Sequence, residues 1–173
     1  LPNDNEARKV IRGNFSFTPL TNLLFSVNTS YTKDNISNTA AGNNAHGLTL
    51  NAFRRDRNYN SNDRPESLNL MLKQEITSEI DHLITGGTMS WSPITSLTNK
   101  FTVGYDLAQI ENRNLRPYGF VLAPTGIISD RTNAYQTLTF DYAGNYAFGL
   151  RSDLRSTVSW GAQSVTTEQR ETS

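Results

Sequence analysis

The chain of 173 residues contains no cysteine, which excludes disulfides and thiolate metal ligands within it. It also lacks any run of about 18 apolar residues, so a transmembrane helix is excluded, whereas a membrane-spanning strand needs only about 9–11 residues. The 16 basic and 16 acidic side chains cancel, and a neutral chain has no electrostatic reason to bind nucleic acid. We therefore expect no nucleic-acid partner.

Residues capable of catalysis or metal binding are scarce as well. Only His46 and His82 could act as bases near neutral pH. Asp81 precedes His82 but cannot orient it, because adjacent residues of a strand point to opposite faces. The acidic residues of 56–66 lack the glycine and the spacing of a calcium loop, and no glycine-rich phosphate loop is present. We therefore expect no enzymatic activity, no metal site and no cofactor.

What the chain does have is a clear two-residue alternation, although hydrophobic residues make up only 36% and the mean hydropathy is −0.53. In the segment 83–92, Leu83 and Trp91 share one face, and the residues of 101–107 alternate in the same way. A period of two is typical of a β-strand, so these segments predict a hairpin. Pro93 fits its corner because proline lacks the N–H that a central ladder position uses.

The same design occurs three times along the chain, which gives six predicted strands. They are expected at about 9–18, 23–33, 83–92, 100–111, 134–148 and 154–166. Short connections at 19–22, 93–99 and 149–153 alternate with long loops at 34–82 and 112–132. The sequence thus predicts an all-β fold, in which three hairpins form an antiparallel up-and-down sheet.

Each hairpin has two unlike faces. One face carries Phe, Leu, Val, Tyr and Trp, and the other carries mostly uncharged Ser, Thr, Asn and Gly. Outer-membrane barrels have an apolar outward face, a polar interior, short periplasmic turns and long extracellular loops. The aromatic girdles of such a barrel would be formed by Phe17, Tyr31, Trp91, Tyr105, Tyr146 and Phe148. We therefore predict that residues 1–173 form part of one transmembrane β-barrel domain.

Part of the first long loop has two readings that the residues leave open. From Leu68 to Ile80, Leu and Ile residues recur every four positions, as on one face of a short helix. From Ile76 to His82, alternation suits a strand that continues beyond the membrane equally well.

Several motifs resemble, in order, a stretch of the barrel of SusC/RagA-type TonB-linked outer-membrane transporters. They are the segments 15–23, 51–54, 81–93, 97–106 and 159–163, which include the corners Phe17-Thr18-Pro19 and Trp91-Ser92-Pro93. The resemblance implies a barrel of about 22 strands with a plugged lumen, in a bacterial outer membrane. It further implies import of oligosaccharides or peptides, powered through TonB, with a SusD/RagB-type lipoprotein as a lid.

Six strands cannot close such a barrel, and two unpaired sheet edges are not tolerated in lipid. The resemblance therefore implies that the rest of the barrel and the plug accompany this segment, with outer-membrane lipid and lipopolysaccharide around it. The chain begins at Leu1 without an initiator Met, and both ends are polar. We accordingly expect a mature or trimmed piece of a longer protein.

Two loop clusters combine aromatic and arginine side chains, which suit sugars, peptides or the backbone of a partner. The candidate substrate-binding residues are Phe53, Arg54, Arg55, Arg57, Tyr59, Asp63 and Arg64 in the first loop and Arg116, Tyr118 and Phe120 in the second. Ligand specificity generally lies on such loops, which a rigid scaffold holds in place. The alternative is a solvated loop whose arginines pair with carboxylates or with lipopolysaccharide phosphates, and the residues favour neither.

Two other functions are compatible with the pattern. A small complete barrel that acts as an adhesin or structural anchor needs at least eight strands, so a further strand pair would have to lie within 34–82. A soluble β-sandwich binding module would expose the Ser/Thr/Asn face to solvent and would be a folded monomer without detergent. The importer segment is the leading hypothesis.

Overall fold

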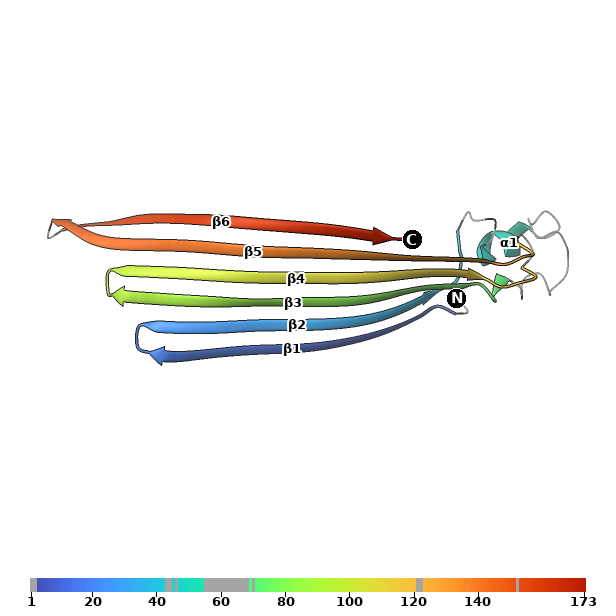
Figure 1. Ribbon diagram of the computed structural model, residues 1–173, viewed down its shortest axis with the longest axis horizontal. Coiled ribbons are helices and arrows are strands. Elements are labelled where there is room, and N and C mark those ends of the chain that lie inside the picture. Colours follow the sequence, from blue (N-terminus) through green and yellow to red (C-terminus); the bar gives the residue numbers. More distant parts are fainter. Residues whose placement is uncertain are drawn as a thin grey trace.

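The computed structural model describes residues 3–42, 45, 47–54, 69, 71–120, 123–151 and 153–173, without the side chains of 52 and 54. Six antiparallel strands form one sheet in the order β1-β2-β3-β4-β5-β6, and each strand pairs with its neighbours in sequence (Figure 1). The elements are β1 (Asn5–Leu20), β2 (Leu23–Asn38), α1 (Leu48–Arg54), β3 (Glu75–Ile94), β4 (Leu97–Arg116), β5 (Ile127–Arg151) and β6 (Leu154–Thr172). The predicted all-β, up-and-down antiparallel fold is confirmed.

The strands run further than the sequence predicts, chiefly into the two long loops. β3 begins at Glu75, and Ile76 pairs with Asn38 while Ile80 pairs with Asp34. Of the two readings left open for this segment, the strand is correct from Glu75 onward. The sequence underestimates these lengths because the outer parts of the strands carry charged and polar residues on both faces.

The two prolines do not lie in the turns, in contrast to the prediction. Pro19 belongs to β1 and Pro93 belongs to β3, and the turns themselves are the residue pairs 21–22 and 95–96. Each proline lies at a register shift, the first between Phe17 and Leu20 and the second between Trp91 and Ile94. A bulge leaves a residue outside the ladder, so the missing N–H of proline costs no hydrogen bond there.

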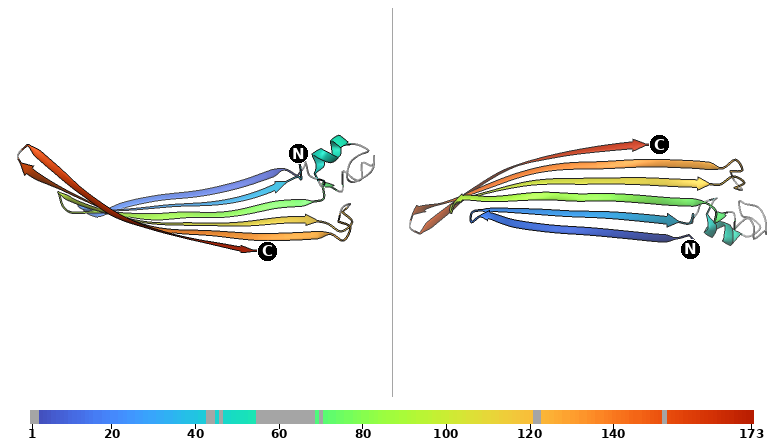
Figure 2. Two further views of the ribbon diagram at one scale, coloured as in Figure 1. Left: turned by 90° about the horizontal axis from the view of Figure 1, so that it is seen from above. Right: turned by 60° about the horizontal axis from the view of Figure 1, so that its bottom comes forward.

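Among the described residues, no second layer of strands or helices covers either face of the sheet. Its strands contact only their neighbours in the sheet, and the buried apolar residues of the described part lie in the long connections, namely Ala40, Met71, Phe120 and Ala123. A β-sandwich requires two packed sheets, and the part of the chain that the structure describes forms only one. Figure 2 shows that the sheet twists along its length, as right-handed strand twist requires.

The end of the sheet opposite the short turns holds both described termini, α1 and the β4–β5 connection (Figure 1). The backbone N–H of Thr39 donates to Asp4 Oδ1 at 2.6 Å, and this hydrogen bond lowers the pKa of Asp4. The buried Asn51 of α1 donates from Nδ2 to the carbonyls of Ala45 and Gly47 at 2.9 and 2.8 Å. Within the ranges described, no helix combines the length and the hydropathy of a membrane span.

Candidate functional site

The strand register collects the large apolar side chains on one face of the sheet, which we call the apolar face. It runs from Trp91, Leu23 and Leu97 near the short turns to Ile11, Tyr31, Leu83 and Leu107 at its other margin. The nine residues from Leu83 to Trp91 span about 27 Å at about 3.4 Å per residue. That length matches an apolar band about 25 Å tall.

Aromatic residues gather near the short turns on the apolar face. Phe17 stacks on Phe25 with ring centroids 5.1 Å apart, and Phe101 stacks on Tyr142 at 4.7 Å. Of the residues predicted to form girdles, Phe17, Trp91, Tyr146 and Phe148 lie toward this end, and Tyr31 lies at the opposite margin. Tyr105 lies one register pair closer to the middle of the apolar face than the residues of that margin.

A hydrogen-bonded aromatic group occupies the apolar face of β4–β6 near the short turns. Trp160 Nε1 donates to the Tyr142 hydroxyl at 3.1 Å, and that hydroxyl donates to Asn99 Oδ1 at 2.8 Å. Gly144 is the register partner of both Asn99 and Trp160, and a Cβ at Gly144 would overlap the indole ring. Glycine at position 144 therefore leaves room for the indole. The indole N–H, the Tyr142 hydroxyl and the Asn99 side-chain oxygen are joined by hydrogen bonds.

The opposite margin of the apolar face changes to charged residues within one register pair. Beyond Tyr31 lie Lys33, Glu79 and Asp81. Lys33 Nζ is 3.8 Å from Glu79 Oε2 and 3.6 Å from Asp81 Oδ2, and the Tyr31 hydroxyl donates to Asp81 Oδ1. A tyrosine that joins an apolar band to a charged border fits an interface between an apolar phase and water.

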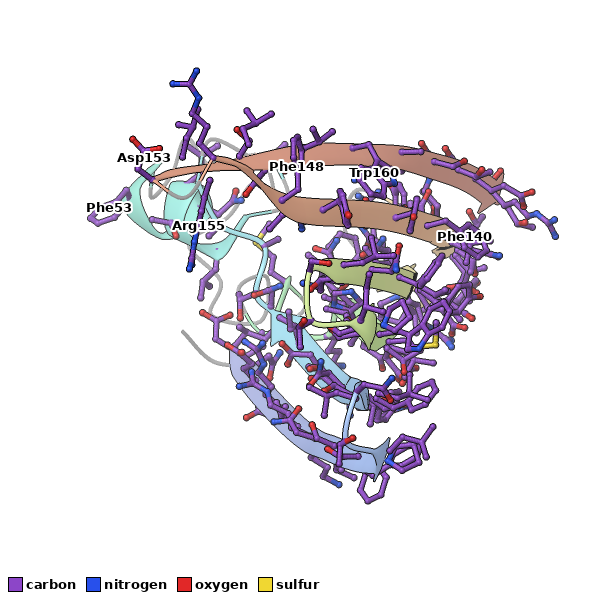
Figure 3. All side chains as sticks on the ribbon, turned by 90° about the vertical axis from the view of Figure 1, so that its left-hand side faces the viewer. Phe53, Phe140, Phe148, Asp153, Arg155 and Trp160 are labelled. Carbon is purple, nitrogen blue, oxygen red and sulfur yellow. The ribbon has the colours of Figure 1, made fainter. Side chains whose placement is uncertain are left out.

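The other face, which we call the polar face, carries hydroxyl, amide and small residues. Hydroxyl groups on neighbouring strands pair with each other, at 3.0 Å for Ser16–Ser26, 3.4 Å for Thr88–Thr102 and 3.3 Å for Thr137–Thr167. Figure 3 looks along the strands from the short turns and shows Phe140 on one side of the sheet and Arg155 on the other. The predicted separation into an apolar and a polar face is confirmed by this register.

Sequence reasoning missed a hydrogen-bonded histidine–carboxylate pair on the polar face. His82 Nε2 lies 2.8 Å from Asp106 Oδ1, and both side chains are partly exposed. Asp81 points to the apolar face, as its contacts with Tyr31 and Lys33 show, so it does not orient His82. The partner could have been found only from the β3–β4 register, in which Asp106 lies diagonally across from His82.

The predicted ligand-contacting residues are placed unevenly. Phe53 and Tyr118 are 83% and 87% exposed, whereas Phe120 is wholly buried in the described structure, and ligand contact by these residues stays a prediction. Its backbone closes a tight turn, because Phe120 N donates to Pro117 O and Ala123 N donates to Phe120 O.

The other predicted ligand-contacting residues are half-buried or only partly described, or lie outside the described residues. Arg116 is half-buried, and its Nε is buried without a hydrogen-bond partner among the described atoms. Arg54 ends α1, but its side chain is not described. Arg55, Arg57, Tyr59, Asp63 and Arg64 lie outside the described residues, as does His46.

One open antiparallel sheet with a membrane-height apolar face, aromatic residues toward its margins and an opposite polar face defines a segment of a β-barrel wall. Solved structures share this fold. The chain is similar to a chain in the structure of the RagAB peptide transporter, with a TM-score of 0.71 at 18% identity over 97% of this chain and 22% of that chain. It is equally similar to the RagAB peptide importer in its closed-closed and open-open states, each with a TM-score of 0.70 and 18% identity.

The comparison extends over only part of those proteins. The chain spans 22% of the first two solved chains and 21% of the third. No protein-family model matches the sequence, and no curated protein matches it. At this identity the likeness establishes the fold of the segment, and those solved structures are described as a transporter or importer.

Proposed function

We propose that residues 1–173 are part of the barrel domain of a TonB-dependent outer-membrane importer. The observation that carries the proposal is the pairing of an apolar face of membrane height with a polar face on the same strands. The similarity to the RagAB peptide importer over 97% of this chain supports the same function. Here the strands form the wall, the polar face lines the lumen, and the long connections lie outside the cell.

The two unpaired edges of the sheet support the proposal that this segment belongs to a larger barrel. β1 and β6 are 16 and 19 residues long, and each pairs on one side only. Unpaired backbone groups of that length cannot remain in lipid. Further strands of the same protein therefore complete a barrel of about 22 strands, whose lumen holds a plug.

The surfaces of the segment suit the partners proposed for the whole importer. The apolar face contacts outer-membrane lipid, and the charged margin at Lys33 lies at the level of lipopolysaccharide head groups. TonB supplies energy from the inner membrane, and a RagB-type lipoprotein covers the loop end. The RagAB structures favour peptides over oligosaccharides as cargo. Phe53, Arg54, Arg116 and Tyr118 are proposed to contact the cargo, together with the arginine, tyrosine and aspartate residues of 55–64.

The proposal is tested on the full-length protein that contains this segment. We expect it to remain in the outer-membrane fraction and to run in detergent as a chain on the order of 100 kDa, as expected for a barrel of about 22 strands. Cells that carry it should accumulate labelled peptides, and deletion of TonB should abolish the accumulation. A detergent-independent monomer would contradict the proposal. A membrane-bound protein that adheres to surfaces without importing anything would support an adhesin instead.

A further inference from the structure

The short turns of the sheet end at different levels, and a hollow that we call the notch lies between two of them. β4 begins at Leu97, which pairs with Tyr146, whereas β5 runs five residues further, to Arg151. The β5–β6 hairpin therefore projects past the turn at 95–96, as the left-hand end of Figure 1 shows. The notch at this step has a volume of about 290 Å³ and is lined by Thr95, Ser96, Ala147, Phe148, Gly149, Arg151 and Arg155.

The backbone of β5 is unpaired where it borders the notch. Ala147 N donates to Ser96 O at 2.8 Å, so the N–H of Ala147 points toward β4. Because the backbone N–H groups of a strand in an antiparallel sheet alternate between its two neighbours, the N–H of Gly149 points the same way. At that level β4 offers no register partner to Gly149. Unpaired N–H groups at the edge of a sheet form concavities that bind anions.

Two arginines flank the notch without carboxylate partners. Arg151 pairs with Leu154 at the tip of the hairpin, and Arg155 pairs with Gly149. Both are exposed, and within the described residues neither forms an ion pair. Figure 3 shows the Arg155 side chain turned away from Asp153. Since guanidinium groups bind phosphate and carboxylate oxygens through paired hydrogen bonds, the notch has the donors of an anion site.

Charged residues at a short turn are particular to this third hairpin. The corners 19–22 and 93–96 read Pro-Leu-Thr-Asn and Pro-Ile-Thr-Ser and carry no charge. In the last hairpin, by contrast, Arg151, Asp153 and Arg155 lie within five residues of one another. The first turn therefore supplies a matched control for the notch.

The depth of the notch in a membrane indicates which anion it meets. Tyr146 and Phe148 lie at the short-turn margin of the apolar face, and Gly149 lies three residues beyond Tyr146. Three residues extend about 10 Å along a strand, or about 8 Å along the axis of a barrel whose strands tilt by about 40°. The head groups of a bilayer form a layer about 5–8 Å thick on each side of the hydrocarbon core. The notch thus lies at the level of phospholipid phosphates.

Two exposed leucines beside the arginines favour a lipid over a soluble anion. Leu150 and Leu154 are 60% and 49% exposed at the tip of the hairpin. Leu154 shares the apolar face with Phe148, because Phe148 pairs with Ser156, two residues further along β6. An amphiphile can contact both kinds of group at once, since its phosphate reaches the arginines while its apolar chains reach the leucines.

We propose that the notch binds the phosphate of one phospholipid from the periplasmic leaflet, with Arg151 and Arg155 as charged donors and the N–H of Gly149 as a backbone donor. The inference rests on the proposed function, because that function places the short turns at the periplasmic surface of the outer membrane. The acyl chains of the bound lipid lie along the apolar face beside Leu154. The third hairpin is thereby fixed at the level of the head groups.

Native mass spectrometry of the full-length protein in detergent tests the site. The probe is palmitoyl-oleoyl phosphatidylglycerol, and the measured quantity is the Kd of the first lipid bound. We expect Arg151→Gln combined with Arg155→Gln to raise this Kd by about tenfold or more, because hydrogen bonds to a charged group are lost. The control replaces Arg8 and Arg12 with glutamine, since both are exposed arginines of β1 away from the short turns. Equal Kd values for the wild-type protein and the notch variant would overturn the proposal.

A second variant leaves both arginines in place. Ser96→Asp puts a carboxylate into the notch, where it pairs with the arginines and excludes phosphate, so we expect the same rise in Kd. Asn22→Asp adds the same charge at the equivalent position of the first turn, where no arginine lies, and should leave the Kd unchanged. Equal weakening by the two variants would show general charge repulsion and would contradict the proposed contact.

Two competitors separate a phospholipid from other ligands. Palmitoyl-oleoyl glycerol has the same chains without phosphate, and we expect it to leave the bound phospholipid in place at equal concentration. Displacement by it would overturn the role of the phosphate. Displacement by an equal concentration of inorganic phosphate would assign the notch to a free anion and overturn the phospholipid.

The outcomes also separate this proposal from the proposed function. If the protein stays in the membrane and imports peptides but the notch variant binds the lipid as the wild type does, only the lipid site fails. If the full-length protein is a monomer without detergent, the proposed importer fails and the lipid site fails with it.

Discussion

Individual contacts of the apolar face already constrain the barrel wall, most clearly at Gly144. A methyl group there would overlap the indole of Trp160. The indole would have to move, and its hydrogen bond to the Tyr142 hydroxyl would be lost. We expect Gly144→Ala in the full-length protein to lower the free energy of unfolding by about 1–3 kcal/mol, as overpacking does, and to change the tryptophan near-UV circular dichroism. Gly149→Ala is the control, because an added Cβ meets only one backbone oxygen at 3.7 Å.

The Tyr142 hydroxyl provides a second test at this scale. It accepts from Trp160 and donates to Asn99, which is buried. Tyr142→Phe leaves a donor and an acceptor unsatisfied, and we expect a loss of about 1–3 kcal/mol in unfolding measured in detergent or lipid. Tyr146→Phe removes a hydroxyl from the same strand and face without such partners in the described structure, so it should have little effect. Equal losses from the two variants would show that the hydrogen bonds contribute nothing specific.

The residues also show where sequence reasoning ends. The two faces follow from alternation alone, because side-chain direction in a strand depends only on parity. The His82–Asp106 pair depends on the register between strands, which the bulges near Pro19 and Pro93 shift. Phe120 looked like an exposed loop aromatic, and its burial depends on a turn closed by Pro117 and Ala123. No local pattern encodes these contacts.

At the scale of the strands, the number and order of the elements were predictable and their lengths were not. Within the apolar face, alternation is strong, so the predicted strands fall in the right places. Outside it, charged residues occupy both faces, and only pairing with a neighbour shows that β3 starts at Glu75 and β5 at Ile127.

The apolar face makes a depth-dependent prediction for a single strand. Val103 lies in the middle of this face on β4, and Gln109 lies on the same face and strand at its charged margin. We expect Val103→Arg to cost about 2–4 kcal/mol in a bilayer and Gln109→Arg about 0–1 kcal/mol. Folding into lipid vesicles, followed by unfolding in denaturant, measures the difference. Equal costs for the two arginines would mean that this face does not lie in the membrane.

For the whole molecule, the decisive property is that the sheet by itself leaves its edge backbone groups unpaired and its apolar face uncovered. Within the described residues, both faces are open, each edge strand is unpaired on one side over its length, and the buried apolar residues lie in the connections. In the described part of the chain, little of the hydrophobic burial that normally offsets the conformational entropy of folding is therefore present. Long unpaired edges beside exposed apolar rows are also aggregation sites.

We therefore expect residues 1–173 alone to fail as a soluble domain and to fold only as part of the proposed complete barrel. Expressed by itself, the segment should aggregate, and in detergent it should unfold over a broad range of temperature without the cooperative transition of the full-length protein. Circular dichroism during heating and sedimentation in buffer measure both properties, with the full-length protein as control. A soluble, cooperatively folding monomer of 19.3 kDa would show that some contact covers the apolar face in water, and the membrane assignment would fail with it.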